Sequence, residues 1–387
     1  MFPRLRFKKF DGDWEKTTIG AKSETVTSGS RDWAQYYSDS GDKFIRMTNL
    51  VRNGINLDLS DLRFVQLPVG SNEGKRTSLE KGDILISITA ELGKLGWIPE
   101  GLGTAYINQH TALVRMKNTL DSKFVAYALS TEKYNNKLNS LNDSGAKAGL
   151  NLGSIRSFEL TIPSKPEQTQ IASFLSVVDE KISQLTQKFE LLSKYKQGMM
   201  QKLFSQQVRF KADDGSDFGA WEDKKLGDIC SHFQSGKTIT SATISDNGAY
   251  PVFGGNGLRG FTDTYTHDGI FALIGRQGAL CGNINLVQGE NFISEHAIAV
   301  QANQESSTQW LAMWLDFMQL NRFSESSAQA GLAVNKLVKF DIKVPCLEEQ
   351  TKIANFLSAI DQKIEVVAQQ IEQAKTWKKG LLQQMFI

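Results

Sequence analysis

Two long stretches of the chain carry apolar residues at alternating spacings of four and three positions. The apolar positions of the first stretch are Ile171, Leu175, Val178, Ile182, Leu185, Phe189, Leu192, Met199 and Leu203. Those of the second stretch are Ile353, Leu357, Ile360, Ile364, Val367, Ile371, Ala374, Leu381 and Met385. One lysine interrupts each stretch, Lys196 in the first and Lys378 in the second. A 3.5-residue period held over about five heptads is typical of a coiled-coil seam. We therefore predict two helices of about 40 residues, each about 60 Å long.

The second stretch repeats the first at a constant offset of 182 residues. The segments Pro163, Glu167–Thr169, Phe174–Ser176, Asp179 and Lys181–Ile182 return as Pro345, Glu349–Thr351, Phe356–Ser358, Asp361 and Lys363–Ile364. Strand-like runs at 158–162 and 340–344 precede the two copies at the same offset. Each proline marks a boundary between a strand and a helix. Because a whole unit is duplicated, we expect a pseudo-symmetric molecule.

The remaining sequence alternates short apolar runs with glycine-containing turns, which is typical of strands. In the first half the predicted strands cover 43–47, 82–88, 96–98 and 111–116, and a helix is predicted from Ser122 to Asn139. In the second half the predicted strands cover 250–253, 269–274, 282–287 and 297–300, and a helix is predicted from Ser307 to Phe323. Both halves are therefore expected to contain a mixed α/β domain.

Each half also opens with a similar arm. The arm Arg4–Phe7 precedes Trp14, and the arm Gln207–Phe210 precedes Trp221, at a tryptophan offset of 207 residues. Because the helix offset is only 182, the first domain is about 25 residues longer than the second. A polar linker at 211–219 supports a boundary there. The expected parts are a domain at 1–162, a long helix at 163–206, a domain at 207–344 and a long helix at 345–387.

The composition is that of an ordinary soluble protein with a nearly balanced charge. The 387 residues have room for two or three domains, and the formal net charge is +2. Residues 1–165 hold 23 Lys and Arg against 18 Asp and Glu, whereas residues 215–345 hold 9 against 13. No strongly basic domain is therefore present, and DNA binding would have to use local patches.

Cysteine usage and hydropathy favour a cytoplasmic protein. Cys230, Cys281 and Cys346 lie far apart in the sequence, which predicts a reducing compartment without disulfides or a zinc site. The first residues lack the apolar core of a signal peptide. No apolar run approaches the ~20 residues of a membrane span, so no membrane partner is expected.

The sequence contains no recognisable catalytic constellation. Gly70–Lys75 resembles a phosphate loop, but its glycines are too close together and Arg76 stands where Ser or Thr is needed. Gly254–Gly257 lacks the βαβ context of a dinucleotide site and is interpreted as a turn. No Asn-Pro-Pro-Tyr or Asp-Pro-Pro-Tyr run is present, and the four histidines are scattered. We therefore predict a non-catalytic chain that holds neither a metal nor a cofactor.

The duplicated motif resembles a known family. It reads Glu-Gln-x-x-Ile-Ala-x-Phe-Leu-Ser-x-x-Asp-x-Lys-Ile after a proline and ends in Lys-x-Gly-[ML]-[ML]-Gln-x-[LM]-Phe, at Pro163–Phe204 and again at Pro345–Phe386. This motif resembles the DNA-specificity subunit of type I restriction-modification enzymes. The runs 82–86, 253–257 and 274–276 also resemble the target-recognition domains of that family.

The resemblance implies both the fold and the partners. Two mixed α/β target-recognition domains would be separated by two long antiparallel helices that form a coiled coil. Each domain would read one half of a split site in double-stranded DNA, while the helices set the spacer and dock the modification (methyltransferase) subunits. S-adenosylmethionine, ATP and magnesium would bind to the partner modification and restriction subunits. The acidic second domain departs from the expected charge of a DNA-binding domain.

Three alternatives remain open at this stage. The chain could serve a related bipartite system with a fused methylase–nuclease partner. It could be a coiled-coil scaffold without any role in nucleic-acid binding, in which case the assembled complex would show no salt-dependent DNA binding. It could also be an enzyme assembled from residues outside any motif, in which case the isolated chain would transfer methyl groups.

Candidate DNA-binding residues are taken from loops that follow or precede predicted strands. Arg, Asn, Gln, Lys and His match the hydrogen-bonding patterns of the base edges and the phosphates. In the first domain the candidates are Thr89, Glu91, Lys94, Asn108, Gln109, His110 and Lys147. In the second domain they are Lys237, Asn256, Arg259, Arg276, Gln277, His296 and Arg322. Among them, Lys147, Lys237 and Arg322 are expected to contact phosphates.

Overall fold

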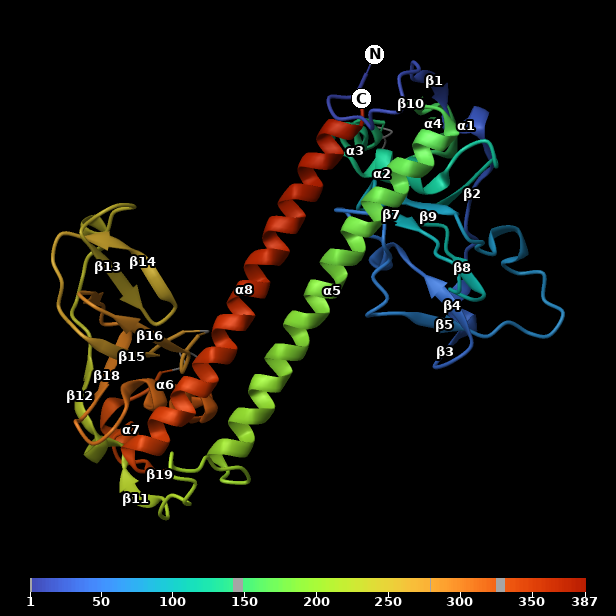
Figure 1. Ribbon diagram of the computed structural model, residues 1–387. Helices are drawn as coiled ribbons and strands as arrows, with labels where there is room; N and C mark the ends of the chain where they lie inside the picture. The colour runs from blue at the N-terminus through green and yellow to red at the C-terminus, as the bar shows by residue number, and fades with distance from the viewer. Residues whose placement is uncertain (1, 142–148, 279, 325–330) are drawn as a thin grey trace. The chain divides into compact units, whose positions relative to one another are not determined.

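The computed structural model describes residues 2–141, 149–278, 280–324 and 331–387. The chain forms two compact units. Unit 1 comprises residues 1–185 and 370–387, and unit 2 comprises residues 186–369. Each unit therefore combines one globular domain with one part of each long helix (Figure 1).

The domain of unit 1 is built on two small sheets. The first has the antiparallel order β2-β9-β6-β7, and its central strand β6 is buried along its whole length. The second has the order β3-β5-β4-β8, in which β4 and β8 are parallel. The strands are β2 (Ser23–Ser28), β3 (Tyr37–Ser38), β4 (Asp42–Ile45), β5 (Arg63–Val65), β6 (Ile84–Ser87), β7 (Leu95–Trp97), β8 (Ala105–Ile107) and β9 (Thr111–Met116).

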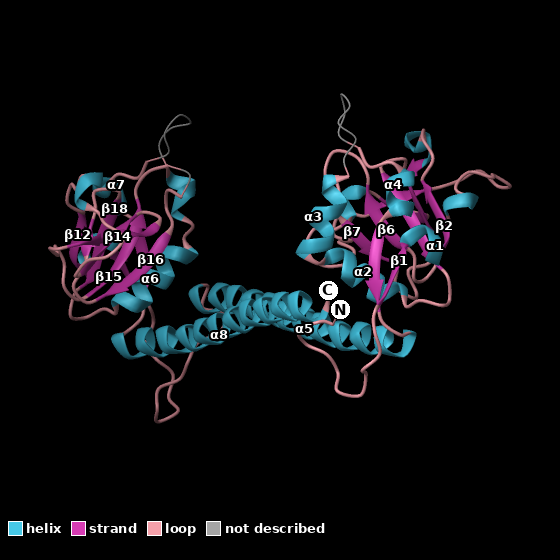
Figure 2. Ribbon diagram, turned by 90° about the horizontal axis from the view of Figure 1, so that it is seen from above, coloured by secondary structure: helices cyan, strands magenta, loops and turns pink. Residues whose placement is uncertain are grey.

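Helices cover the first sheet of unit 1 and contribute to its core. The α-helices of this domain are α1 (Ile19–Lys22), α2 (Ser122–Ser130), α3 (Glu132–Ser140) and α4 (Leu152–Ser157). Short 3-10 turns lie at η1 (Trp33–Tyr36), η2 (Met47–Asn49) and η3 (Lys75–Thr77). Phe124 and Tyr127 of α2 are fully buried in the same core as Ile84 and Ile86 of β6. Figure 2 shows α2 beside β6.

The domain of unit 2 repeats this topology with different side chains. Its sheets have the orders β12-β18-β15-β16 and β14-β13-β17, and β13 and β17 are parallel. The strands are β12 (Cys230–Ser235), β13 (Tyr250–Gly254), β14 (Gly257–Thr262), β15 (Ile270–Gly275), β16 (Ile284–Gln288), β17 (Phe292–Ile293) and β18 (Ala297–Ala302). Its helices are α6 (Thr308–Phe317) and α7 (Val334–Leu337), with 3-10 turns at η4 (Leu226–Ile229), η5 (Ser241–Thr243) and η6 (Leu320–Phe323).

In each unit a short strand from the arm pairs with the strand that leads into a long helix. β1 (Glu15–Thr18) pairs antiparallel with β10 (Glu159–Ile162). β11 (Glu222–Lys225) pairs in the same register with β19 (Asp341–Val344). The beginning and the end of each globular domain are thus joined beside the start of its helix.

Two helix predictions were wrong in detail. The helix predicted from Ser122 to Asn139 is split at Thr131, whose backbone is extended and whose hydroxyl accepts a hydrogen bond from the Tyr134 amide. Such an N-cap satisfies an amide at the start of a new helix. The helix predicted from Ser307 to Phe323 ends with α6, because Gln319 has a left-handed φ of 49° before the η6 turn. β2, β12 and β14, whose polar sequences carry little alternation, were not predicted.

The two long helices are confirmed and pack together. They are α5 (Lys165–Phe204) and α8 (Leu347–Met385). In unit 1, Ile171 and Leu175 of α5 share a core with Leu381 and Met385 of α8. In unit 2, Leu203 of α5 shares a core with residues 353–360 of α8. The predicted apolar seam is therefore the buried face of each helix.

The two lysines that interrupt the seam form ion pairs across it. Lys378 lies 2.5 Å from Asp179, and the two side chains are only 13% and 11% exposed. Lys196 lies 2.6 Å from Asp361. From Asp179 to Lys196 the residue number rises along α5, whereas the paired residue on α8 falls from Lys378 to Asp361. The two helices are therefore antiparallel. Because both the aspartates and the lysines are 182 residues apart, the two ion pairs are the same contact made once in each unit.

The Glu-Gln pair of the duplicated motif fastens each domain to its helix. The buried carboxylate of Glu167 accepts hydrogen bonds from Arg6 at 2.7 and 2.8 Å. Glu349 accepts from Arg209 at 3.0 and 2.7 Å. Gln168 accepts a hydrogen bond from the amide of Asp121, the N-cap of α2. Gln350 accepts one from Ser307, the N-cap of α6. The motif thus joins the arm, the domain and the long helix at one place.

Candidate nucleic-acid interface

In unit 1 most of the candidate residues lie where three segments of the backbone meet. The amide of Ile88, just after β6, donates to the His110 carbonyl at 3.0 Å. The amide of Leu150 donates to the Ile88 carbonyl, also at 3.0 Å. We call this place the loop junction of unit 1; it comprises residues 88–94, 108–110 and 149–150. Loops at the end of a rigid sheet are well suited to hold recognition side chains.

A side-chain network orders part of this junction. Thr89 Oγ1 lies 2.8 Å from Nδ1 of His110, and Gln109 Nε2 lies 3.1 Å from Nε2 of the same ring. The His110 amide also donates to Asn108 Oδ1 at 3.1 Å. The structure therefore brings these four candidates together.

Glu91 and Lys94 belong to the same junction, but they form an ion pair with each other. The hydrogen bond from Lys94 is the main reason that the pKa of Glu91 lies below its usual value. The Lys94 amide also donates to Ser87 Oγ at 2.8 Å. Since the two charges cancel locally, this turn offers little net positive charge to a phosphate.

Unit 2 has a loop junction with the same backbone connections. The Arg276 amide donates to the His296 carbonyl at 3.0 Å, and the Leu332 amide donates to the Arg276 carbonyl at 3.0 Å. Arg276 therefore takes the place that Ile88 has in unit 1. We define this junction as residues 276–277, 294–296 and 331–332. Within the part of the chain that the structure describes, no hydrogen bond or ion pair engages the Arg276 guanidinium.

The β13–β14 hairpin brings two more candidates to this junction. A Cβ atom at Gly255 would lie 2.8 Å from both Gly275 Cα and the His296 carbonyl oxygen, so glycine permits direct backbone contact. Asn256 is exposed at the tip of the hairpin, and Arg259 extends over Gly254 from β14. The turn predicted at Gly254–Gly257 is confirmed, and it lies against Arg276.

Lys237 reaches the same junction from the end of β12. Its amide donates to the Ile293 carbonyl at 2.9 Å, and its carbonyl accepts from the Glu295 amide at 3.1 Å. Glu295 also lies 3.5 Å from Nε2 of His296. The bridge between Lys237 and Ser294 corresponds to one between Ser30 and Asn108 in unit 1.

This correspondence identifies a segment that the sequence analysis missed. Ser30 stands 207 residues before Lys237, which is the offset already visible between the two tryptophans. The exposed Arg31 follows directly. Applying that offset to Lys237 would have pointed to Ser30, and the basic residue beside it, Arg31, would have become a candidate of the first domain.

Two candidates stand apart from the junctions. Arg322 lies in η6, with its guanidinium 4.7 Å from the ring centre of Phe323, and within the described residues no hydrogen bond joins it to the junction of unit 2. Lys147 lies outside the described residues. The structure therefore gathers twelve of the fourteen candidates at the two junctions, six in each unit.

Two histidines of unit 2 do not add positive charge to this surface. The rings of His232 and His267 lie 5.3 Å apart. Burial, assisted by His232 and Lys237, lowers the pKa of His267 to about 4. Burial also lowers the pKa of His232, and Lys237 adds to that effect. Both imidazoles are therefore neutral near pH 7.

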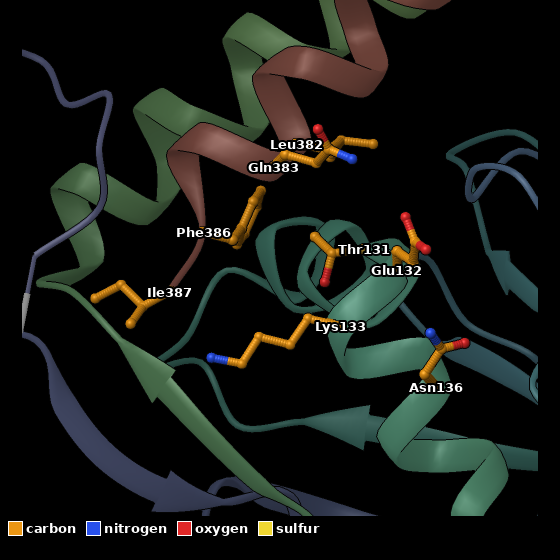
Figure 3. Close-up of a pocket in the computed structure, with 8 residues that line it drawn as sticks. All are labelled: Thr131, Glu132, Lys133, Asn136, Leu382, Gln383, Phe386 and Ile387. Atoms are coloured by element: carbon orange, nitrogen blue, oxygen red, sulfur yellow. The ribbon is translucent and has the colours of Figure 1, made fainter.

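The described residues contain no cluster of three or more potential metal ligands and no helix long and apolar enough to cross a membrane. A hollow of about 340 Å³ in unit 1 lies between the start of α3 and the last turn of α8 (Figure 3). Its polar side chains are Thr131, Glu132, Lys133, Asn136 and Gln383. This set contains no nucleophile–base pair.

The described residues thus form two α/β domains, each joined to parts of both long helices and each carrying a junction of polar loops. Residues 12–193 and 219–376 match the family model described as the type I restriction modification DNA specificity domain. The chain belongs to this family and is a DNA specificity subunit, the non-catalytic component of a type I restriction-modification system.

Individual relatives agree with this assignment. The chain is 28% identical over 350 residues to the type I restriction enzyme EcoprrI specificity subunit of Escherichia coli, covering 86% of this chain and 83% of the relative. It is 24% identical over 413 residues to the MjaX specificity subunit of Methanocaldococcus jannaschii, described as putative, covering 98% of this chain and 94% of the relative.

The fold is likewise shared with solved structures. The crystal structure of the type I restriction-modification S subunit from M. genitalium matches with a TM-score of 0.70 at 19% identity, covering 100% of this chain and 99% of that one. A chain from a study of complex assembly and conformational transition of the type I R-M system matches with a TM-score of 0.53 at 14% identity, covering 96% and 97%. The predicted architecture of two α/β domains and two long packed helices is thereby confirmed.

Proposed function

We propose that each domain, residues 1–162 and residues 207–344, reads one half of a split target in double-stranded DNA. The observation that carries this proposal is the pair of loop junctions. Both use the same backbone hydrogen bonds, at Ile88 and at Arg276, yet they present different polar side chains. A constant frame with variable donors and acceptors is what two half-sites of different sequence require.

Within this proposal the candidate residues have distinct roles. Asn108, Gln109, His110 and Thr89 read bases in the first half-site, with Glu91 and Lys94 beside them. Asn256, Arg259, Arg276, Gln277 and His296 read the second half-site. Lys147, Lys237 and Arg322, together with Arg31, contact phosphates. This small number of basic contacts matches the modest net charge of the chain and implies that partner subunits add to the affinity.

The long helices at 163–206 and 345–387 set the spacer and dock the modification subunits. Both helices expose large apolar side chains that an isolated coiled coil would not need. These are Val177 and Trp377 in unit 1 and Leu191, Tyr195 and Val366 in unit 2, each more than half exposed. Tyr195 and Trp377 occupy equivalent positions of the repeat, as expected for two equivalent docking sites.

The chemistry of the system belongs to the partners. S-adenosylmethionine binds to the modification subunits, and ATP and magnesium bind to the restriction subunits of a cytoplasmic complex. The proposal is tested by reconstituting the chain with its modification subunits and mapping methylated positions in random DNA. Methylation of a single split motif supports it, and methylation without any split motif contradicts it.

Replacing Arg276 with alanine should damage recognition of one half-site only. A bidentate contact between Arg and guanine is worth about 1–3 kcal/mol of base discrimination. We therefore expect a loss of selectivity, by roughly 10-fold or more, at one or two positions of one half-site. Competition binding with single-base variants of both half-sites measures this effect. The base variants of the other half-site, measured with the same protein, serve as the internal control. An equal loss of affinity for all sequences would instead make Arg276 a phosphate contact.

The isolated chain should neither methylate nor cleave DNA. Within the described residues no metal cluster is present, and the sequence has no methylase motif or phosphate loop. Incubation with S-adenosylmethionine, ATP, magnesium and target DNA is expected to yield no methylated or cut product, as measured by tritium transfer and gel electrophoresis. Turnover by the pure chain that is lost on mutating one of its own residues would refute this expectation.

A further inference from the structure

The outer edge of β16 in unit 2 is an unpaired strand edge. Within the described residues, β16 pairs only with β15, on its inner side. Gly275 accepts the Gly282 amide and donates to Asn283, and Gly269 and Gly289 exchange hydrogen bonds. The odd-numbered residues of β16 therefore face β15, and Ile284, Leu286 and Gln288 direct their amides and carbonyls outward. None of these outward groups has a protein partner within the described residues.

The equivalent edge in unit 1 is covered by the chain itself. There β7 pairs with β6, and its outward residues are Leu95 and Trp97. Leu95 exchanges two backbone hydrogen bonds with Val51, at 2.9 and 2.8 Å. The Trp97 amide donates to the Ile55 carbonyl at 2.7 Å. The β4–β5 connection, residues 46–62, thus acts as an added strand on this edge.

Unit 2 lacks that connection. The segment between β13 and β14 consists only of Gly255 and Asn256, so nothing in it can reach β16 as residues 46–62 reach β7. The side chains reflect the difference. Leu95 is fully buried, whereas Leu286 is 47% exposed and Leu258 of β14 is 56% exposed.

The edge of β16 also lacks the usual protection against pairing. A lysine, a proline or a β-bulge normally prevents an exposed strand edge from pairing with another chain. Residues 284–288 contain no charge and no proline, and their register with β15 is regular. At one end of the edge, Asp268 and Glu290 are exposed beside the paired glycines. Neither carboxylate has an ion-pair partner among the described residues.

We propose that the outer edge of β16 binds an extended segment of a partner subunit as an added strand. The segment places an apolar side chain on Leu286 and a Lys or Arg near Glu290 and Asp268. The inference rests on the proposed assembly with modification and restriction subunits. A second copy of this chain fits less well, because it would bring a second domain with an excess of four negative charges over residues 215–345.

Backbone amide exchange of residues 282–290 tests the inference directly. In the isolated chain, Ile284 and Leu286 should exchange rapidly, while Leu95 and Trp97 should be protected. In the assembled complex, exchange at Ile284 and Leu286 should slow by at least about 10-fold. Unchanged exchange in a complex that methylates its target refutes the inference but leaves the proposed function intact. Protection of these amides already in the isolated monomer also refutes it, and so does protection that appears only with dimerisation of the chain.

A set of variants provides the second measurement. Leu286→Pro removes an outward amide without breaking a bond to β15, because proline is tolerated at such edge positions. Leu286→Lys places a charge at the proposed apolar contact, and Glu290→Lys reverses the charge at the proposed acidic contact. Each should weaken assembly with the partner subunit by about 10-fold, equivalent to 1.4 kcal/mol, whereas Leu258→Lys on β14 should not. Equal assembly of all four variants overturns the inference, and failure of the unaltered chain to assemble contradicts the proposed function instead.

Discussion

Replacing Arg209 with alanine is expected to destabilise unit 2 by about 3 kcal/mol, since breaking a buried ion pair leaves an uncompensated charge. The Glu349 carboxylate is fully buried and accepts two hydrogen bonds from Arg209 and one from Trp221 Nε1 at 3.0 Å. After the substitution, only the Trp221 indole still donates a hydrogen bond to the Glu349 carboxylate. The chain continues on both sides of residue 209, so the arm cannot simply detach and admit water. Urea unfolding followed by tryptophan fluorescence measures the loss.

Two control variants separate this effect from a general loss of surface charge. Lys352→Ala removes an ion pair with Asp213 one turn further along α8, where Asp213 is 94% exposed. That pair should contribute little to stability, because solvent screens an exposed ion pair. The double variant Arg209→Met with Glu349→Met should recover most of the stability, because an apolar pair leaves no buried charge. If Arg209→Ala cost no more than Lys352→Ala, the Glu-Gln motif would not be the fastening point.

The same contact exists in unit 1 with one difference. Arg6 donates to Glu167, but Trp14 Nε1 has no hydrogen-bond partner among the described residues, whereas its counterpart Trp221 donates to Glu349. Among the described residues, Glu167 thus accepts side-chain hydrogen bonds from Arg6 alone. Repeated motif residues therefore hold the same geometry in both units, while neighbouring residues set how firmly each arm is held.

The sequence predicted the elements whose signal is long or repeated. The heptad spacing predicted α5 and α8, and runs such as 82–88 and 111–116 predicted strands because they are rich in apolar and β-branched residues. β12, with the sequence Cys-Ser-His-Phe-Gln-Ser, was missed because its polar residues are placed by pairing with β18 rather than by their own propensity. The split at Thr131 was missed because a threonine within a helical pattern does not by itself indicate an N-cap.

The candidate site was predictable in outline only. Choosing polar loops at strand ends selected residues that do meet at the junctions, since strand order places those ends together. The sequence separation of Glu91 and Lys94 does not determine whether their side chains form an ion pair, because this depends on the geometry of the turn. The role of Lys196 and Lys378 was also hidden, because each lysine pairs with an aspartate from the other copy of the repeat. Only the antiparallel register of the helices brings those residues together.

That register also defines the most informative insertion. The ion pairs Asp179–Lys378 and Lys196–Asp361 lie on either side of one midpoint, between Gln187 and Lys188 on α5 and between Gln369 and Gln370 on α8. Seven residues inserted at both points keep the apolar seam facing its partner. Both ion pairs and both loop junctions remain untouched, so each unit should retain its own structure.

We expect the complex with both insertions to modify the same two half-sites at a longer spacer. Seven helical residues add about 10 Å at 1.5 Å per residue. Since DNA rises about 3.4 Å per base pair, the unread spacer should lengthen by roughly three base pairs. Methylation mapping on a library of spacer lengths measures the change. The same insertion in α5 alone is the control; it shifts the two helices out of register and should abolish modification at every spacing. If the double insertion is helical by circular dichroism yet modifies only the original spacing, the helices do not measure the DNA.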